Sequence, residues 1–306
     1  MSNLTSLKIL ELVDLMLENN DAKFLLDDIC NNCYLKLKNL VIINTTKDIF
    51  PLIHPGVFLN LNILVISPQN LCDDLVHLLG FTSIQHLHIK SNSYSMATEA
   101  CEPISYRIWE QTKKQNPTLG VHLEGMNEIF WQNGAPVKSL ILNGNKKMIQ
   151  ADIVMQAIEQ YDNSLEAFIF NGIPRFYRSK SFHDRADNSL MLLSHQCSNL
   201  SILVIHERIS TATILLIAST LKNLKYLIVR RNAIIIKMDW PKRHNWSDDF
   251  YTWMKTNSKK YELVEREISI IMGYRWKMLT DKEFKNLKLT PYKSKLNSSI
   301  FDFTFN

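Results

Sequence analysis

A few residues of this 306-residue chain have types and spacings that could support chemistry. Cys30 and Cys33 form a CxxC pair, but a zinc site needs about four ligands, and no second CxxC or paired histidines lie within zinc-finger spacing. The pair lies toward the end of an amphipathic stretch, whereas a reactive thiolate is favoured at a helix start. We therefore expect packed, buried cysteines at these positions.

Two further groups could suggest catalysis or metal binding. His86 and His88 flank Leu87 and would share one face of a strand, but two ligands are too few for a tight metal site, so we expect surface or partner contacts. His183 and Asp184 are half of a possible catalytic pair, yet no GxSxG elbow accompanies them. HExxH, GxxxxGK[ST] and GxGxxG are also absent. The sequence predicts no enzyme, no cofactor and no metal.

The composition places positive charge at one end of the chain. Hydrophobic residues make up 46% and charged residues 21%, which is ordinary for a folded protein. Residues 1–233 contain 21 basic and 21 acidic residues, whereas residues 234–306 contain 14 and 9. Basic residues with Trp240, Trp246 and Trp253 would permit nucleic-acid binding, but acidic residues are interleaved. We expect a solvated cap and no nucleic-acid partner; an adaptor whose basic cap binds RNA or acidic surfaces is the alternative.

The sequence shows no pattern typical of a membrane-spanning or secreted protein. No segment approaches the roughly 18 consecutive apolar residues of a membrane helix. The amino terminus has no basic start, and Glu11 and Asp14 interrupt its apolar part, unlike a signal peptide. Five cysteines, an odd number without such a signal, indicate reduced thiols. The sequence predicts a cytoplasmic or nuclear protein without a membrane partner.

The elements that must position these residues come from a repeat. In the stretch Leu221–Asn232, Leu224, Leu227 and Val229 are spaced LxxLxL and Asn232 follows three places later, which is the leucine-rich-repeat pattern. Leu227 and Val229 share one face of a strand, and the asparagine can bond the backbone where the chain turns. One such strand cannot bury its own apolar face, so it requires neighbours.

Nine copies recur at a mean spacing of about 27 residues, within the usual range of these repeats. The copy at Val121 is degenerate because it has no clear leucine three residues earlier. Amphipathic helical stretches, such as residues 70–80 and 149–158, separate the copies. The fold class is α/β: a leucine-rich-repeat solenoid, a right-handed βα horseshoe with a basic C-terminal cap. The expected strands are centred near Leu10, Leu40, Leu64, Leu87, Val121, Leu140, Phe168, Leu203 and Leu227.

A tenth unit is suggested by two distant segments, 109–119 and 253–263, which share Trp, Thr and Leu at the same offsets. Each has a helix-like half before a strand-like half. We therefore place a leucine-rich-repeat domain at 1–271, with about nine to ten irregular repeats, and a C-terminal cap and tail at 272–306. The terminal SIFDFTFN alternates apolar and polar residues like one more strand and could cover the concave face.

The repeat period also identifies side chains on the concave face. The central residue is aliphatic in six of nine copies, at Val41, Val65, Ile141, Ile169, Val204 and Ile228. An exposed apolar row of this length suggests a covering partner. The alternative is that parallel strands carry β-branched residues on both faces.

Long connections after the strands, at 90–105, 125–136, 171–190 and 230–247, would leave along one edge and carry aromatic residues and arginines, as protein interfaces do. The alternative is that these aromatics fold inward. We predict a partner-binding surface formed by Ile169, Arg175, Phe176, Tyr177, Arg178, Val204, Ile228, Trp240, Arg243 and Trp246.

The segment Cys197–Ile205, CSNLSILVI, closes a helix with cysteine and opens a strand with LxxLxI, and it resembles the degenerate repeats of F-box proteins that carry leucine-rich repeats. The resemblance covers most of residues 1–271. Similarity to the F-box only proteins with irregular repeats is carried by Trp109, Asn116, Pro117, Leu119, Val121 and Leu123.

This resemblance implies a protein-binding scaffold that serves as the substrate-recognition part of a cullin-RING ubiquitin ligase receptor. An F-box, a helical segment that begins with a Leu-Pro motif, would bind the adaptor Skp1. None precedes the first strand here. We expect Skp1 and cullin as partners only if an F-box exists upstream, and we expect a monomer whose target the sequence does not name.

Overall fold

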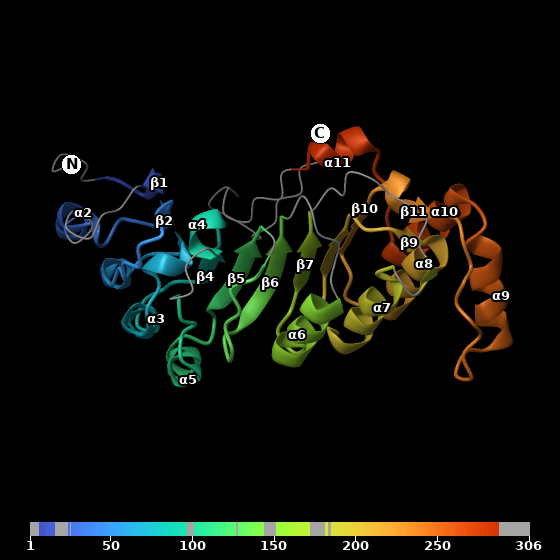
Figure 1. Ribbon diagram of the computed structural model, residues 1–306, viewed down its shortest axis with the longest axis horizontal. Coiled ribbons are helices and arrows are strands. Elements are labelled where there is room, and N and C mark those ends of the chain that lie inside the picture. Colours follow the sequence, from blue (N-terminus) through green and yellow to red (C-terminus); the bar gives the residue numbers. More distant parts are fainter. Residues whose placement is uncertain are drawn as a thin grey trace. The chain divides into compact units, whose positions relative to one another are not determined.

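The computed structural model (Figure 1) describes residues 6–15, 24, 26–96, 101–126, 128–143, 151–171, 181–182 and 185–287. The chain divides into two compact units, Met1–Asn143 and Gly144–Asn306. Nine strands form one all-parallel sheet in the order β1-β2-β3-β4-β5-β6-β7-β8-β10, alternating with helices. The predicted α/β class is confirmed, and each of the nine predicted strand centres lies within one of these strands.

Unit 1 consists of six strands with short helices between them. Helices α3 and α5 pack side by side (Figure 1). The elements are β1 (Ile9–Leu15), α2 (Asp27–Cys33), β2 (Asn39–Asn44), the 3-10 helix η1 (His54–Val57), β3 (Ile63–Ile66), η2 (Pro68–Asn70), α3 (Asp73–Leu79), β4 (His86–Lys90), α4 (Ser93–Met96), α5 (Tyr106–Gln115), β5 (Gly120–Gly125) and β6 (Val137–Leu142).

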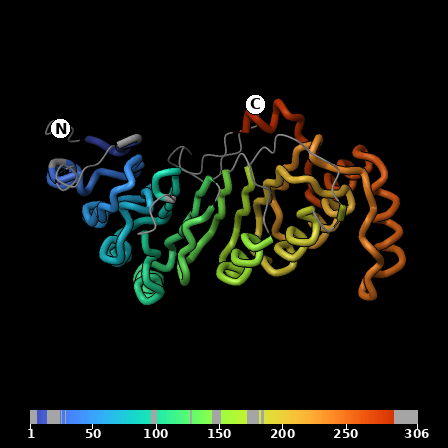
Figure 2. Tube along the Cα trace, in the orientation of Figure 1, coloured from blue at the N-terminus to red at the C-terminus, as the bar shows by residue number. Residues whose placement is uncertain are grey.

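Unit 2 continues the alternation and ends in helices. Helix α7 lies between α6 and α8, and α8 also packs against α9 and α10, as the trace in Figure 2 shows. The elements are α6 (Ala151–Tyr161), β7 (Ala167–Phe170), α7 (Asp187–Gln196), β8 (Ile202–Ile205), β9 (Ile209–Ser210), α8 (Thr211–Thr220), β10 (Tyr226–Val229), η4 (Arg231–Ala233), β11 (Ile234–Ile235), α9 (Asp248–Asn257), α10 (Tyr261–Met272) and α11 (Asp281–Lys285).

The strand register follows the leucine pattern except at the degenerate fifth copy. Leu40 pairs with Leu64, and Leu64 with Leu87. Between β5 and β6, however, Val121 pairs with Val137 and His122 with Ser139, so Lys138 is an additional residue and the register shifts. As a result, Ile141 pairs with Glu124 and not with His122, the central residue of the fifth copy.

The asparagines at strand ends have different roles. The Asn92 side-chain amide donates to the backbone carbonyl of Asn44 at 2.7 Å, as the repeat pattern predicts. The side chain of Asn232 instead donates to the Asp281 carboxylate at 2.9 Å. Before the strands, Asn199 and Asn223 donate to the carbonyls of Asn163 and Ser198. Asparagine side chains therefore bond backbone at both ends of the strands.

The structure corrects one expectation about the helices. Helix α2 begins at Asp27 and buries Ile29, next to the buried Leu26, whereas Phe24 is exposed. The strand expected after Trp253 is absent from the described residues, because α9 is followed directly by helix α10 (Tyr261–Met272). Helix α10 takes the place of the expected tenth strand, because its buried residues Val264 and Ile268 are four positions apart, at helical spacing.

The concave row is buried and not exposed. Val41, Val65, Ile141, Ile169, Val204 and Ile228 are at most 5% exposed. A parallel sheet that is covered on both faces carries β-branched residues on both faces. This agrees with the alternative interpretation of the aliphatic row. The SIFDFTFN tail lies outside the described residues.

Leu227→Ala tests the register of the last repeat. Leu227 lies in β10 and is 2% exposed, so its truncation should lower the free energy of unfolding by about 2 to 5 kcal/mol. Urea unfolding followed by circular dichroism measures the loss. Lys225→Ala, at a neighbouring exposed position, is the matched control and should change stability little. A loss below about 1 kcal/mol for Leu227→Ala would contradict its place in the core.

Candidate functional site

The residues predicted to bind a partner separate into three groups in the structure. Arg175, Phe176, Tyr177 and Arg178 lie outside the described residues. Ile169, Val204 and Ile228 form one continuous row, because Val204 pairs with both of the others. This row is buried, so it is not the open apolar floor that the sequence predicts. Trp240, Arg243 and Trp246 lie in the connection between β11 and α9.

Trp240 is buried, with 3% of its surface exposed, and anchors that connection to unit 2. Its indole Nε1 donates to Thr213 Oγ1 at 2.8 Å, and its ring meets Phe182 edge-on with centroids 5.0 Å apart. Phe182 belongs to the connection 171–190, so the two connections meet, as their shared edge predicts. Trp240 therefore folds inward, which was the alternative to a place on the partner-binding surface.

A buried ion network lies beneath Trp240. Arg185 donates from Nε to the Asp187 carboxylate and from a terminal guanidinium nitrogen to Asp239, both at 2.7 Å. The other Asp187 oxygen accepts from the Ser210 backbone N–H at 2.9 Å and also from the Ser210 and Thr213 hydroxyls. Ser210 is the N-cap of α8. The network therefore joins the start of α7, the start of α8 and the connection before α9.

Arg243 and Trp246 form the outer part of the same connection. The exposed Arg243 guanidinium lies 5.1 Å from the Trp240 ring centroid and 5.5 Å from that of Trp246, a cation–π arrangement on both sides. Trp246 meets Phe250 edge-on at 5.8 Å. Of the predicted site residues that the structure describes, Arg243 and Trp246 alone are not buried.

A groove beside β10, which ends the nine-stranded sheet, is the better candidate for recognition. The segment 274–279 runs beside β10 and closes its open edge. Tyr274 Oη donates to the Lys225 carbonyl at 3.0 Å, Trp276 Nε1 to the Leu227 carbonyl at 2.6 Å, and the Leu279 N–H to the Val229 carbonyl at 2.9 Å. These bonds satisfy the acceptors that an edge strand would otherwise present to another strand.

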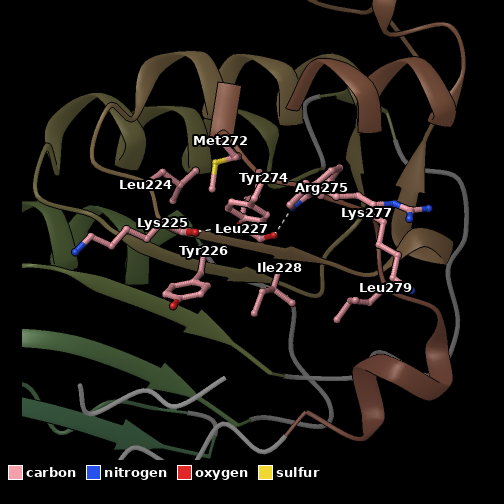
Figure 3. A pocket seen from close by; sticks show the side chains of 11 residues that line it. Leu224, Lys225, Tyr226, Leu227, Ile228, Met272, Tyr274, Arg275, Lys277 and Leu279 are labelled. Carbon is pink, nitrogen blue, oxygen red and sulfur yellow. Dashed lines mark hydrogen bonds between the residues drawn. The ribbon is translucent and has the colours of Figure 1, made fainter. Parts of the chain in front are cut away.

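The groove between β10 and this segment is a cavity of about 790 Å³ (Figure 3). Of the predicted site residues with a described position, Ile228 contributes to its lining. Aliphatic residues and three aromatic rings form most of the lining, and Lys225, Arg275 and Lys277 supply positive charge. A mostly apolar concave site with a few polar groups is the usual form of a ligand pocket. The full lining is Leu224, Lys225, Tyr226, Leu227, Ile228, Met272, Tyr274, Arg275, Trp276, Lys277 and Leu279.

Tyr226 and Tyr274 give the groove accessible aromatic surface. They are 37% and 44% exposed. Burial of the phenol, followed by the nearby Tyr226, raises the pKa of Tyr274, which keeps this group neutral and able to donate its hydrogen bond. The residues 274–277, YRWK, belong to this site, but the sequence pattern indicated only that they are part of a basic cap.

Several acidic side chains near the C-terminal end of the chain lie beside basic residues. Hydrogen bonds from Lys277 and then Thr280 lower the pKa of Glu283 to about 2, so this carboxylate stays ionised beside its lysine. The ion pairs are Arg230–Asp281, Arg231–Glu262, Lys242–Asp248, Arg266–Glu267 and Lys277–Glu283. Acidic residues interleaved with the basic ones reduce the positive potential that a polyanion would meet.

Binding of RNA should therefore be weak. We expect affinity for a single-stranded RNA probe that falls steeply with salt, since the phosphate contacts replace released counterions. Fluorescence anisotropy from low salt to about 0.2 M measures it. A sub-micromolar affinity that persists at about 0.2 M salt would contradict the expected solvated cap and favour the RNA-binding alternative.

Histidines of unit 1 form a second polar cluster. The His88 and His122 rings stack with centroids 4.3 Å apart, and His86 Nδ1 lies 3.3 Å from His122 Nε2. His122 Nδ1 is 2.7 Å from Ser139 Oγ. His88 and His122 are buried, which corrects the expectation of surface or partner contacts for His88.

The cysteines show no sign of activation. Burial and then Asp27 raise the pKa of Cys30 to about 11, and Cys33 is buried. The five cysteines are unbonded thiols, as expected. His183 and Asp184 lie outside the described residues.

Within the described ranges, no group of three or more His, Cys, Asp or Glu side chains is placed to hold a metal ion, and no helix is long and apolar enough to cross a membrane. What the described site can do is bind: it offers a lined groove with aromatic surface and cations, and no assembled nucleophile and base. Comparison of the chain with models of protein families and with curated proteins gave no match.

Proposed function

We propose that the chain is a protein-binding scaffold and not an enzyme, built as a leucine-rich-repeat solenoid with a basic C-terminal cap. The observation that carries the proposal is the groove beside β10, which is apolar, aromatic and cationic. The protein acts in the cytoplasm or nucleus as a monomer. The LxxLxL copies and the parallel strands in chain order support the solenoid.

The chemistry of the groove favours a protein partner. Interfaces combine an apolar centre with a polar rim and are enriched in tyrosine, tryptophan and arginine. The accessible Tyr226, Tyr274 and Arg275 supply two of these residue types at one place. The groove belongs to the strand scaffold, which fixes its geometry, since Trp276 is buried and bonded to β10.

We further propose, from the resemblance to F-box proteins, that the scaffold recognises targets for a cullin-RING ubiquitin ligase. In that arrangement the repeats bind the target, and Skp1 and cullin are reached through an F-box. No residue of this chain is assigned to Skp1 binding.

Site-specific photo-crosslinking tests the scaffold function. A photoreactive phenylalanine analogue at Tyr226, in the groove, should give discrete protein adducts in living cells. The matched control carries it at Tyr106, which is 55% exposed, belongs to unit 1 and does not line the groove. Adducts at position 226 that are absent at position 106 support the scaffold. Absence of adducts at 226 in a correctly folded protein would overturn it.

The ligase role has a separate test. The 306-residue chain should fail to bind purified Skp1, and the same chain with an F-box joined before residue 1 should bind it. The joined protein, with cullin and RING subunits, should transfer ubiquitin to the protein captured at position 226. Tight Skp1 binding by the chain alone would contradict this division of roles, and failure of transfer from an assembled complex would contradict target recognition.

A further inference from the structure

We propose that the groove beside β10 binds a short acidic peptide whose apolar residues lie between carboxylates. The inference rests on the proposed scaffold function and names the class of partner that the groove recognises. Three features of the groove carry it: accessible aromatic rings beside a buried apolar floor, cations at both ends, and a closed strand edge.

The aromatic border of the groove can receive hydrophobic side chains. The rings of Tyr226 and Tyr274 are accessible, and they border a floor of Leu227, Ile228 and Leu279 that is itself buried. Burial of a leucine or phenylalanine side chain against such a surface is favourable by about 25 cal/mol per Å² of apolar area. The peptide therefore requires at least one large apolar residue at its centre.

The positive charges of the groove favour a ligand with negative charge at both of its ends. Figure 3 shows Lys225 extending to one end of the groove, with Arg275 and Lys277 at the other. In the part of the chain that the structure describes, the lining includes no aspartate or glutamate. Lys277 is shared with Glu283 at 2.5 Å, but among the residues that the structure describes neither Lys225 nor Arg275 has an ion-pair partner. Such cations attract carboxylates and repel a basic segment.

The closed edge excludes recognition by strand addition. The carbonyls of Lys225, Leu227 and Val229 already accept hydrogen bonds from the segment 274–279. An incoming peptide cannot form a parallel ladder with these acceptors, so side chains must hold it. A fatty-acid-like amphiphile has one charged head, whereas the cations lie at two ends, which favours the peptide.

The length of β10 sets the spacing. Its four residues span roughly 13 Å, at about 3.3 Å per residue. A peptide with about three apolar residues between its acidic groups matches that span. The probe is therefore fluorescein-labelled Glu-Asp-Glu-Leu-Phe-Leu-Glu-Asp-Glu, measured by fluorescence anisotropy with the full chain.

The expected result is saturable binding that weakens with salt. The double variant Lys225→Glu, Arg275→Glu should weaken it at least about tenfold, because both rim cations become repulsive. Both side chains are exposed, so the fold should persist, as circular dichroism will verify. The matched control Lys255→Glu, Lys259→Glu reverses two exposed cations outside the lining and should change affinity less than about twofold.

Several results would overturn the inference. One is that a peptide with lysines and arginines in place of the acidic residues binds as tightly as the acidic probe. Another is that a peptide whose apolar residues are dispersed binds as tightly as the probe. A third is that the two double variants weaken binding of the probe equally. Binding of dodecanoate together with no binding of the acidic peptide would assign the groove to an amphiphile. If the double variant fails to fold, salt-independent binding by the natural chain would overturn the inference. In each case, adducts from position 226 would still support the scaffold, so the two proposals can fail separately.

Discussion

Replacing Asp187 with alanine is expected to destabilise unit 2 by roughly 3 to 5 kcal/mol, the range for removing one partner of a buried ion pair. Arg185 and Asp187 are both buried, and the guanidinium would lose its fully buried partner. The Ser210 N–H and two hydroxyls would also lose their acceptor. Buried donors without acceptors add to the loss, because they were desolvated in folding.

Urea unfolding monitored by circular dichroism measures the effect, with Asp239→Ala as the matched control. Asp239 binds the same guanidinium at the same 2.7 Å but is 22% exposed, so water can replace it. The control should lose clearly less stability than Asp187→Ala. Equal losses, or a larger loss for the control, would show that burial does not decide the energetics of this network.

The strands could be predicted because their cause is local. Each LxxLxL copy places two large aliphatic residues on one face, and Leu40, Leu64 and Leu87 then pair in register. Val121, in the copy without that leucine, still pairs with Leu87 in register, and the shift comes between β5 and β6, where Lys138 is an additional residue. The sequence indicated the weak copy but not the direction of the shift.

The candidate site was less predictable, since it depends on contacts distant in the chain. Tyr274 and Trp276 bond carbonyls of residues 49 positions earlier, which no repeat spacing encodes. Trp240 shows the same limitation. A tryptophan in a long connection is equally compatible with a partner interface and with inward packing, and its bond to Thr213 decides for the latter.

The helices α9 and α10 also show why the strand expected after Trp253 does not form. The segment 253–263 shares residue types with 109–119, and in both the tryptophan lies in a helix, α5 and α9. After α5 comes a strand, whereas after α9 comes α10, because Val264 and Ile268 recur at helical and not at alternating spacing. The segment 274–279, and not a tenth repeat, closes the sheet edge.

The histidine pair of unit 1 is expected to make the protein unstable in mild acid. Burial, followed by the charges of His86 and Lys90, lowers the pKa of His88 to about 3. Burial and then His88 also lower the pKa of His122. The stacked rings, with centroids 4.3 Å apart, cannot both become charged without strong repulsion.

The sign follows from proton linkage. In the unfolded chain these histidines titrate near pH 6.5, whereas the folded protein holds them neutral to much lower pH. The unfolded state therefore binds more protons below about pH 6.5. The stabilising contribution is fully present above that pH and is lost as the pH falls toward about 3, the folded pKa of His88. Each histidine adds a slope of about 1 kcal/mol per pH unit within that window.

His88→Val isolates this effect, because Val65 already occupies the paired position in the neighbouring strand. Urea midpoints of the natural chain and the variant should diverge as the pH is lowered from 7 to 4.5, with the variant losing less stability per pH unit. Acid effects of carboxylates are common to both proteins and cancel in the difference. His244→Val, at an exposed position of unit 2, should follow the natural chain. If all three curves run parallel between pH 7 and 4.5, His88 is not held neutral by its burial, and acid sensitivity must come from other groups.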